Sequence, residues 1–284
     1  EAFMQRLRGG RITPDDHEFM RDVEDLALGR GQRSRVLKEL RRAETPENAH
    51  ALLLELGLWE AQLNPYPLRQ GAPTRQPDLP FPALPVEDRR DLTSLRAFAI
   101  DDEWNDTPDD ALSLDGNRLW VHVADAAALV EPDSPLDLEA RARGMSLHLP
   151  EGTVHMLPRG ITALLGLGLQ EVSPALSFGL DLGDDGGVTG FEVVPSWVRV
   201  DRLSYPEAEL MIEREPLRSL AHLAGLARER RRAGGAVMID FPEVRLAVNE
   251  GQVRVFPLPP LRSRSLVEEC MILANVAAAR YIEK

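Results

Sequence analysis

Acidic side chains crowd into one short stretch of the 284-residue chain, between residues 101 and 110. Carboxylates this close repel one another, so a folded chain keeps them together only where water, basic side chains or cations neutralise their charge. Oxygen-rich clusters suit hard cations such as Mg²⁺ or Mn²⁺, and Mg²⁺ takes only one or two carboxylates beside water and phosphate oxygens. The stretch therefore predicts a metal site, with a solvated acidic loop as the alternative. Its acidic residues are Asp101, Asp102, Glu103, Asp106, Asp109 and Asp110.

Predicted strands flank this stretch on both sides. Residues 95–100 read as a short buried strand that enters it, and residues 119–125 read as a buried strand that follows a turn at 114–119. Strands of this kind would hold the carboxylates of the intervening loop in place. This context favours a built site over a solvated loop.

The aspartate spacing resembles the catalytic loop of the ribonuclease II family of exoribonucleases, whose pattern is Asp, five residues, Asp, one residue, Asp-Asp. Asp101, Asp109 and Asp110 match it, whereas Thr107 stands at the second aspartate and Asp106 lies one position earlier. The resemblance implies that the three matching aspartates are catalytic and hold Mg²⁺ or Mn²⁺. We predict that Asp106, the nearest spare carboxylate, takes the metal-binding place left by Thr107.

Three further segments resemble the same family. His148 lies where the family usually has a tyrosine, Tyr205 matches a tyrosine near the terminal nucleotide, and Glu268 and Glu269 belong to a Glu-Glu-x-Met helix. The resemblance implies that His148 stacks on RNA bases and that Tyr205 acts in both catalysis and RNA binding. It also implies that one of the two glutamates braces the RNA-facing wall.

Each of these residues also has a plainer interpretation. A loop histidine often has neither a ligand nor a stacking role, and a tyrosine at a strand end commonly packs in the core with its hydroxyl bonded. Glutamates in the first turns of a helix are commonly capping or solvated groups. The sequence also departs from the family at Ile239, where phenylalanine is usual, and at Ser173, where arginine is usual.

Composition limits the classes of protein that the chain can belong to. The formal net charge of −13 argues against a surface that is basic throughout, but it leaves room for a nuclease whose site is itself acidic. The lone Cys270 excludes an internal disulfide framework and a cysteine-based zinc site, and it favours a reducing cytoplasm. No apolar run is long enough to cross a bilayer, and the first residues lack the apolar core of a signal peptide, so no membrane partner is expected.

The pattern along the chain predicts an α+β protein with two domains. Residues 1–64 read as short helices, either a helix-turn-helix module of the winged-helix kind that contacts nucleic acid or a plain helical bundle. Residues 65–86 are rich in proline and read as a linker. Residues 87–284 resemble the first part of a mixed α+β catalytic domain of the RNB type. In the family this domain continues into an arginine-rich segment and an RNA-binding barrel of the OB type, and we expect the chain to be truncated before both.

Local signals predict several elements. Thr13-Pro14 and Thr45-Pro46 are typical of helix starts. Phe19, Val23, Leu26 and Ala27 share the spacing of one helical face. Further elements are a helix over 136–145, hairpins that pair 175–182 with 188–194 and 244–248 with 253–256, and a helix that contains 265–275.

These observations predict a processive, metal-dependent 3′ to 5′ exoribonuclease that hydrolyses single-stranded RNA to nucleoside 5′-monophosphates. The main alternative is a catalytically impaired RNA-binding homologue, because Thr107 replaces one carboxylate. A glycosidase with paired carboxylates fits the acid density, but Trp104 and Trp120 alone are thin support for a sugar-binding site. The residues give no indication of protein partners.

Overall fold

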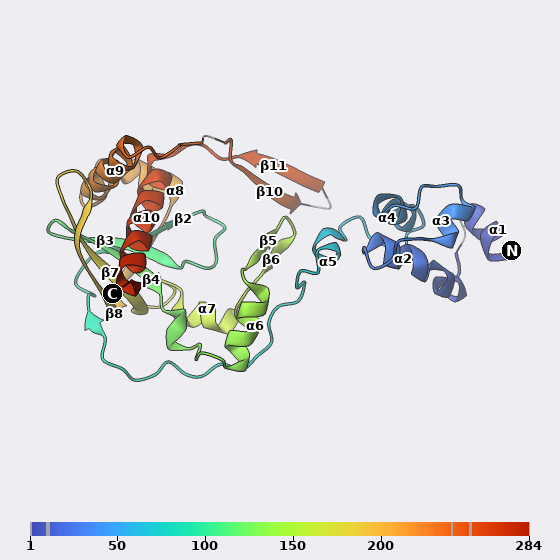
Figure 1. Cartoon of the computed structure of the whole chain (residues 1–284), viewed down its shortest axis with the longest axis horizontal. Helices are drawn as coiled ribbons and strands as arrows, with labels where there is room; N and C mark the ends of the chain where they lie inside the picture. Colours follow the sequence, from blue (N-terminus) through green and yellow to red (C-terminus); the bar gives the residue numbers. More distant parts are fainter. Residues whose placement is uncertain (1, 10–11, 240, 250–251, 284) are drawn as a thin grey trace. The chain divides into compact units, whose positions relative to one another are not determined.

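The computed structural model describes residues 2–9, 12–239, 241–249 and 252–283. The chain forms two compact units, both drawn in Figure 1. Unit 1 comprises Glu1–Pro77, Ala142–Met156 and Leu246–Val255, and unit 2 comprises Asp78–Arg141, Leu157–Arg245 and Phe256–Lys284. The predicted domains, 1–64 and 87–284 with a linker between them, are continuous in sequence, whereas these units are not. The predicted domain boundaries stay predictions.

Short helices form the N-terminal part of unit 1, and side chains cap their starts. The Thr45 hydroxyl accepts a hydrogen bond from the Asn48 amide at 3.3 Å, and Pro46 occupies the first turn, as predicted. Thr13 precedes a 3-10 helix, where its amide and hydroxyl donate to Asp16 at 3.1 and 2.9 Å. The helices are α1 (Ala2–Arg8), the 3-10 helix η1 (Pro14–Met20), α2 (Arg21–Ala27), α3 (Arg35–Glu39), α4 (Pro46–Glu55) and α5 (Tyr66–Arg69).

The expectation that Phe19 shares a helical face with Val23, Leu26 and Ala27 is wrong. The Phe19 side chain is 54% exposed, while Met20, Val23 and Leu26 are buried in the core of the unit. Phe19 belongs to η1, which has three residues per turn, so the period of α2 does not extend back to it.

A seven-stranded sheet is the centre of unit 2. Its strand order is β1-β8-β7-β4-β3-β2-β9; the two edge strands pair in parallel and the inner ones pair antiparallel. This mixture of helices and sheet confirms the predicted α+β class. The strands are β1 (Arg90–Asp91), β2 (Ala97–Asp101), β3 (Asp110–Asp115), β4 (Arg118–Ala124), β7 (Ser173–Leu182), β8 (Val188–Val198) and β9 (Val200–Ser204).

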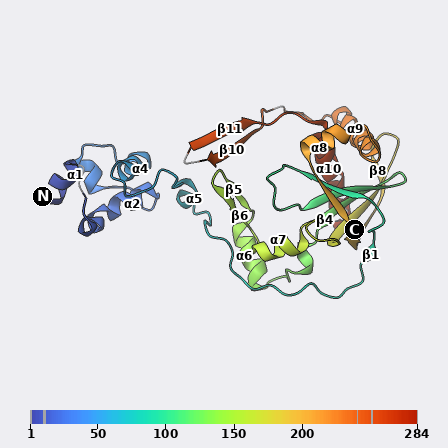
Figure 2. The same ribbon diagram turned by 180° about the vertical axis from the view of Figure 1, so that it is seen from behind.

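Helices α8, α9 and α10 cover one face of this sheet (Figures 1 and 2). Leu112 and Val121 point from the central strands into the same core as Leu266 and Leu273 of α10, because alternate residues of a strand face one side. A second buried cluster around Trp120 lies among the residues that alternate with them. The helices of this part are η2 (Ala126–Ala128), α6 (Pro135–Arg143), α7 (Arg159–Leu165), α8 (Tyr205–Met211), α9 (Leu217–Ala233) and α10 (Arg262–Ile282).

Two two-stranded sheets complete the structure, and the strands of the first pair antiparallel. The first is β5 (Leu147–Leu149) with β6 (Gly152–Val154), and the second is β10 (Val244–Asn249) with β11 (Gln252–Pro257). The second confirms the predicted pairing of 244–248 with 253–256, and its turn residues Glu250 and Gly251 lie outside the described residues. The predicted hairpin of β7 with β8 and the predicted helices over 136–145 and 265–275 are also confirmed.

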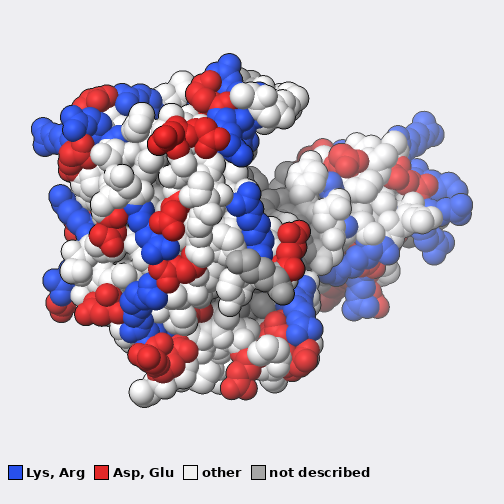
Figure 3. Space-filling view, turned by 60° about the vertical axis from the view of Figure 1, so that its left-hand side comes forward, with Lys and Arg blue, Asp and Glu red and all other residues white. Residues whose placement is uncertain are grey.

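Charges of both signs are interspersed on the face of the molecule drawn in Figure 3. This distribution agrees with the net charge, which argued against a surface that is basic throughout. In the described parts of the chain, no helix combines the length and the apolar character that a membrane crossing requires.

Candidate active site

The acidic stretch lies where neighbouring strands of unit 2 end and begin. Asp101 is the last residue of β2 and Asp110 is the first residue of β3, and these strands pair antiparallel. The loop over 102–109 joins these two strands, so the two aspartates lie at the same end of the β2–β3 pair. The sequence prediction that flanking strands hold these carboxylates is therefore confirmed.

The two strand-end carboxylates are partly buried and incompletely paired. The Oδ2 atoms of Asp101 and Asp110 are buried, and neither has a hydrogen-bond partner among the described residues. Burial raises the pKa of Asp110 to about 7, and the nearby charges of Asp101 and Asp109 raise it further. Burial also raises the pKa of Asp101, although a hydrogen bond from Asn105 opposes this shift. Asp109 is exposed and belongs to the same electrostatic cluster.

Tyr205 lies beside these carboxylates because of how β9 is paired. Asp101 is the register partner of Ser204, the last residue of β9, and Tyr205 follows as the first residue of α8. The Ser204 hydroxyl caps this helix by accepting a hydrogen bond from the Glu207 amide. Burial raises the pKa of the Tyr205 hydroxyl well above its ordinary value, and the negative charges of Asp101 and Asp110 add to that shift. The hydroxyl is therefore protonated at neutral pH and can act as a hydrogen-bond donor.

Arg264 is a site residue that the sequence analysis missed. It lies in the first turn of α10, its Nη2 forms an ion pair with Asp102, and its guanidinium lies 4.1 Å from the centre of the Tyr205 ring. The neighbouring Ser263 hydroxyl donates to the Tyr205 carbonyl at 2.9 Å, so the start of α10 is tied to the start of α8. No local motif marks this arginine, because its partners lie far away in the sequence.

The donor set fits a divalent cation. A buried carboxylate oxygen without a partner costs free energy, and a hard cation satisfies such an oxygen. The described residues contain no group of three or more His, Cys, Asp or Glu side chains with the geometry of a metal site. Asp101 and Asp110 nevertheless offer two carboxylates, the number that Mg²⁺ ordinarily takes beside water and phosphate oxygens.

Asp106 and Thr107 lie farther along the same loop. The Asp106 side chain is 68% exposed, and its Oδ2 lies 3.6 Å from Nη2 of Arg159. The amide and hydroxyl of Thr107 donate to Oδ1 of Asn105 at 2.9 and 3.0 Å. Thr107 thus closes a local turn through Asn105. In this arrangement the Asp106 carboxylate is directed to Arg159, and its predicted metal role stays a prediction.

The other predicted site residues have different surroundings. Glu269 is buried and accepts hydrogen bonds from Nε and Nη2 of Arg231 of α9 at 2.9 and 2.6 Å. Glu268 is exposed and follows Arg264 by four residues, so it shares that face of α10. His148 is exposed on β5 of unit 1, where its Nδ1 lies 3.1 Å from the Thr153 hydroxyl. The RNA-binding roles of these residues stay predictions.

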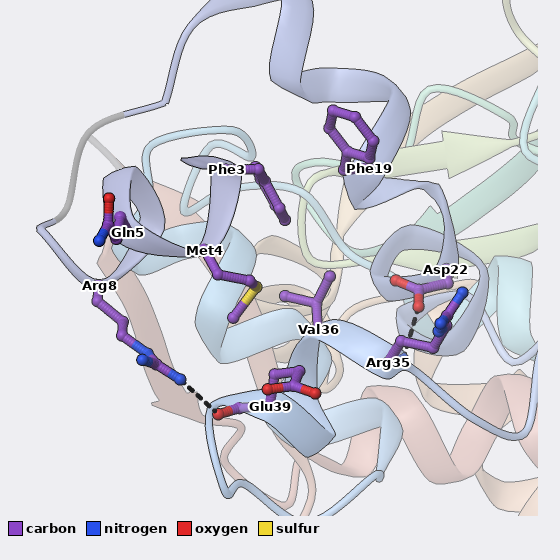
Figure 4. Close-up of a pocket in the computed structure, with 9 residues that line it drawn as sticks. All are labelled: Phe3, Met4, Gln5, Arg8, Phe19, Asp22, Arg35, Val36 and Glu39. Carbon is purple, nitrogen blue, oxygen red and sulfur yellow. Dashed lines mark hydrogen bonds between the residues drawn. The ribbon is translucent and has the colours of Figure 1, made fainter. Parts of the chain in front are cut away.

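A separate pocket of about 780 Å³ lies in the helical part of unit 1 (Figure 4). The Asp22 carboxylate accepts a hydrogen bond from the Arg35 backbone amide at 2.6 Å, and the Arg8 guanidinium donates to the Glu39 backbone carbonyl at 3.4 Å. None of the predicted site residues lines it, so it carries no part of the catalytic assignment. Its lining residues are Phe3, Met4, Gln5, Arg8, Phe19, Asp22, Arg35, Val36 and Glu39.

Comparison with known proteins identifies the family. Residues 89–284 match the RNB domain, and residues 1–65 match the double HTH domain of ribonuclease II proteins. The chain belongs to the RNB-domain family. The RNB match includes the whole acidic loop and Tyr205, and the double HTH match favours the helix-turn-helix interpretation over a plain bundle. Membership also favours the nuclease interpretation over the glycosidase.

One curated relative matches almost the entire chain. An uncharacterized ribonuclease of Synechocystis is 35% identical over 309 residues, which cover 99% of this chain and 46% of the relative. The chain therefore spans less than half the length of that relative.

Solved structures of RNB proteins share the fold. The Dss1 exoribonuclease of Candida glabrata, an active-site mutant, has a TM-score of 0.83 at 20% identity, covering 99% of this chain and 45% of that one. Mycoplasma genitalium RNase R in complex with ribose-methylated single-stranded RNA has a TM-score of 0.63 at 21% identity, covering 69% and 33%. Yeast Ssd1, a pseudonuclease, has a TM-score of 0.52 at 22% identity, covering 69% and 26%.

Proposed function

We propose that the chain carries the carboxylate site of a processive 3′ to 5′ exoribonuclease that hydrolyses single-stranded RNA to nucleoside 5′-monophosphates. One observation carries the proposal: two partly buried aspartates, each with an unpaired oxygen, lie at the same end of β2 and β3, beside Tyr205. Membership of the RNB-domain family supports the reaction class. We also propose that the protein acts in the cytoplasm, as the sequence predicts.

Each residue of the site has a distinct part in this proposal. Asp101, Asp109 and Asp110 would hold Mg²⁺ or its bound waters, with Mn²⁺ as a substitute. When bound, the cation supplies charge compensation at the phosphodiester and lowers the pKa of a water. Tyr205 stays protonated and donates a hydrogen bond to the terminal nucleotide. Arg264 holds the Tyr205 ring in place and keeps Asp102 turned away from the substrate phosphate.

Contacts with the rest of the RNA would come from residues outside this cluster. Glu268 is exposed on the Arg264 face of α10, so it is the better placed of the two glutamates to brace the RNA. His148 is exposed on its hairpin, and an exposed imidazole can stack on any base. Both assignments are consistent with an enzyme that moves along RNA without reading its sequence.

A catalytically impaired RNA-binding protein is the second candidate. The observation that favours it is Thr107, whose hydroxyl is used in a turn with Asn105 at the position where the family has a carboxylate. Family likeness does not separate the two candidates, because one of the structural neighbours is a pseudonuclease. Catalysis itself must be measured.

The test follows end-labelled single-stranded RNA with the full-length protein in Mg²⁺, in Mn²⁺ and in excess EDTA. We expect nucleoside 5′-monophosphates with either metal and none with EDTA. Asp109→Asn should lose most of kcat while its affinity for RNA in EDTA stays the same or improves, because one repulsive charge is gone. Asp115→Asn, an exposed change at the other end of β3, is the matched control. Full activity in EDTA, or near-normal cleavage by folded Asp109→Asn protein, would overturn the metal-site assignment.

A further inference from the structure

An exposed tryptophan lies in the acidic loop itself. The Trp104 side chain is 44% exposed, and the guanidinium of Arg245 lies 3.8 Å from the centre of one ring. Single exposed apolar residues are common and need no explanation. Trp104 differs because a cation covers part of the indole while much of its surface remains open to solvent.

The loop holds this indole in place from both sides. Asp102, two residues before Trp104, forms an ion pair with Arg264. Asn105, the next residue, accepts a hydrogen bond at its carbonyl from Nη2 of Arg202 at 2.8 Å and one from the Thr107 amide at its side chain. A ring fixed in this way loses little freedom when a ligand stacks on it. The loop residues on both sides of Trp104 are thus held by contacts, and the Trp104 side chain itself is not part of the core.

Arg245 gives the indole a cationic neighbour in a loop that itself carries only acidic charges. In the described part of the chain, its guanidinium forms no hydrogen bond or ion pair, and the contact with Trp104 is the one interaction that it makes. Its N–H groups are therefore available to an anion. Glu103 and Asp109 of the same loop are exposed and repel phosphate, so a free guanidinium at this position offsets part of that repulsion.

The position of Trp104 relative to Asp101 follows from chain length. Three residues span at most about 11 Å, so the backbone of Trp104 lies within about that distance of Asp101, and a nucleotide is of comparable size. Stacking on an aromatic ring is available to every base, and an arginine beside the ring adds an electrostatic contribution.

We propose that Trp104, held by Arg245, is a stacking site for a base of single-stranded RNA next to the nucleotide bound at the carboxylates. This inference rests on the proposed function, because it takes RNA as the ligand of the site. Arg245 contacts the phosphate backbone beside the stacked base. The pair gives the acidic loop a means of binding RNA that is independent of base identity.

The test measures binding of full-length protein to a fluorescent single-stranded oligoribonucleotide in EDTA. Trp104→Ala should weaken binding roughly 5- to 150-fold, as the loss of one stacked base predicts. Trp104→Phe should keep most of the affinity, because it retains an aromatic face. Tyr281→Ala, which removes another exposed aromatic side chain of unit 2, is the matched control and should bind as wild type does. A thermal melt of each variant confirms folding.

Oligonucleotides with one abasic position at a time test stacking directly. Wild-type affinity should fall when the contacted base is missing, and Trp104→Ala should cause no further loss with that oligonucleotide. Arg245→Ala should reduce the dependence of binding on salt by about one phosphate contact, and Arg245→Lys should restore that dependence. Wild-type affinity that is insensitive to every abasic position would overturn the proposal.

The outcomes separate this inference from the proposed function. If wild type degrades RNA but Trp104→Ala binds it as tightly as wild type, the stacking site is wrong and the nuclease stands. If RNA binding depends on Trp104 but no condition gives cleavage, the nuclease is wrong and the stacking site stands. If wild type does not bind RNA in EDTA, the stacking site is wrong, and the cleavage assay alone decides the proposed function.

Discussion

Two aspartates, one in each unit, have opposite surroundings. Asp16 of unit 1 is 1% exposed, and its carboxylate accepts hydrogen bonds from Arg6 and from the amide and hydroxyl of Thr13. Asp110 of unit 2 is also largely withdrawn from water, yet its Oδ2 has no partner among the described residues. The pKa of Asp16 is lowered, chiefly by the hydrogen bond from Arg6, whereas burial raises the pKa of Asp110 to about 7.

The comparison distinguishes carboxylates that stabilise the fold from carboxylates that keep an oxygen available to a ligand. A buried charge with sufficient donors favours the folded state, and a buried charge without them opposes it. Glu269 belongs to the first kind, because Arg231 satisfies both of its oxygens. Asp101 and Asp110 belong to the second kind. Substitutions should therefore affect folding in one group and activity in the other.

The largest effect is expected from Asp110→Asn. We expect kcat to fall on the order of a thousandfold, as for other charged groups that act on a transition state. The melting temperature of the protein in EDTA should stay the same or rise, because an unpaired buried charge is removed. Single-turnover cleavage and thermal melts measure the two quantities, with Asp115→Asn as the control.

A stabilising role for Asp110 would contradict the distinction between it and Asp16. In that case Asp110→Asn would lower the melting temperature in the absence of metal, and the loss of activity would follow from unfolding.

A stability loss without a direct loss of chemistry is expected from Glu269→Gln. The Glu269 side chain is 2% exposed and that of Arg231 is 31% exposed, so the substitution leaves a partly buried guanidinium without its charged partner. We expect the free energy of unfolding to fall by about 1–3 kcal/mol. Urea unfolding measures this loss, and kcat of the folded variant should remain within about twofold of wild type.

The control for Glu269 is the exposed pair of Glu213 with Arg262, whose side chains are 70% and 60% exposed. Glu213→Gln should change the free energy of unfolding by less than about 1 kcal/mol. If instead Glu269→Gln leaves stability intact and weakens RNA binding, Glu269 is the brace that the sequence predicts.

The sequence predicted the parts of the site that have a local signature. The acidic spacing located Asp101, Asp109 and Asp110, and short apolar runs located the strands on either side of the acidic stretch. Arg264 escaped prediction because its partners Asp102 and Tyr205 are distant in the sequence, and only the docking of α10 on α8 brings them together. Phe19 was wrongly grouped with Val23 and Leu26 because helical periodicity assumes an α-helix where the chain forms a 3-10 helix.

A smaller, pH-dependent effect is expected at Asp16. Because its pKa is lowered in the folded state, the unfolded chain binds more protons in acid, and the stability that Asp16 contributes is lost as pH falls below the ordinary aspartate range. Asp16→Asn should remove that contribution at neutral pH and flatten the pH dependence. Hydrogen exchange in peptides that cover η1 and α2, corrected for the intrinsic effect of pH, measures this. Asp15→Asn, an exposed neighbour, should keep the wild-type dependence.

The smallest effect is expected from Asp106→Ala. This substitution tests whether another carboxylate of the same loop takes part in catalysis. Asp106 is 68% exposed and lies 3.6 Å from an equally exposed Arg159, so its carboxylate is a solvated group with a weak partner. If the Asp106 carboxylate has no part in the chemistry, kcat should stay within about threefold of wild type, since exposed substitutions usually change little. The measurement is single-turnover decay of end-labelled RNA across a Mg²⁺ titration, with Arg159→Ala beside it. A loss of more than about tenfold that excess Mg²⁺ reverses would show that Asp106 turns inward to replace the carboxylate missing at Thr107.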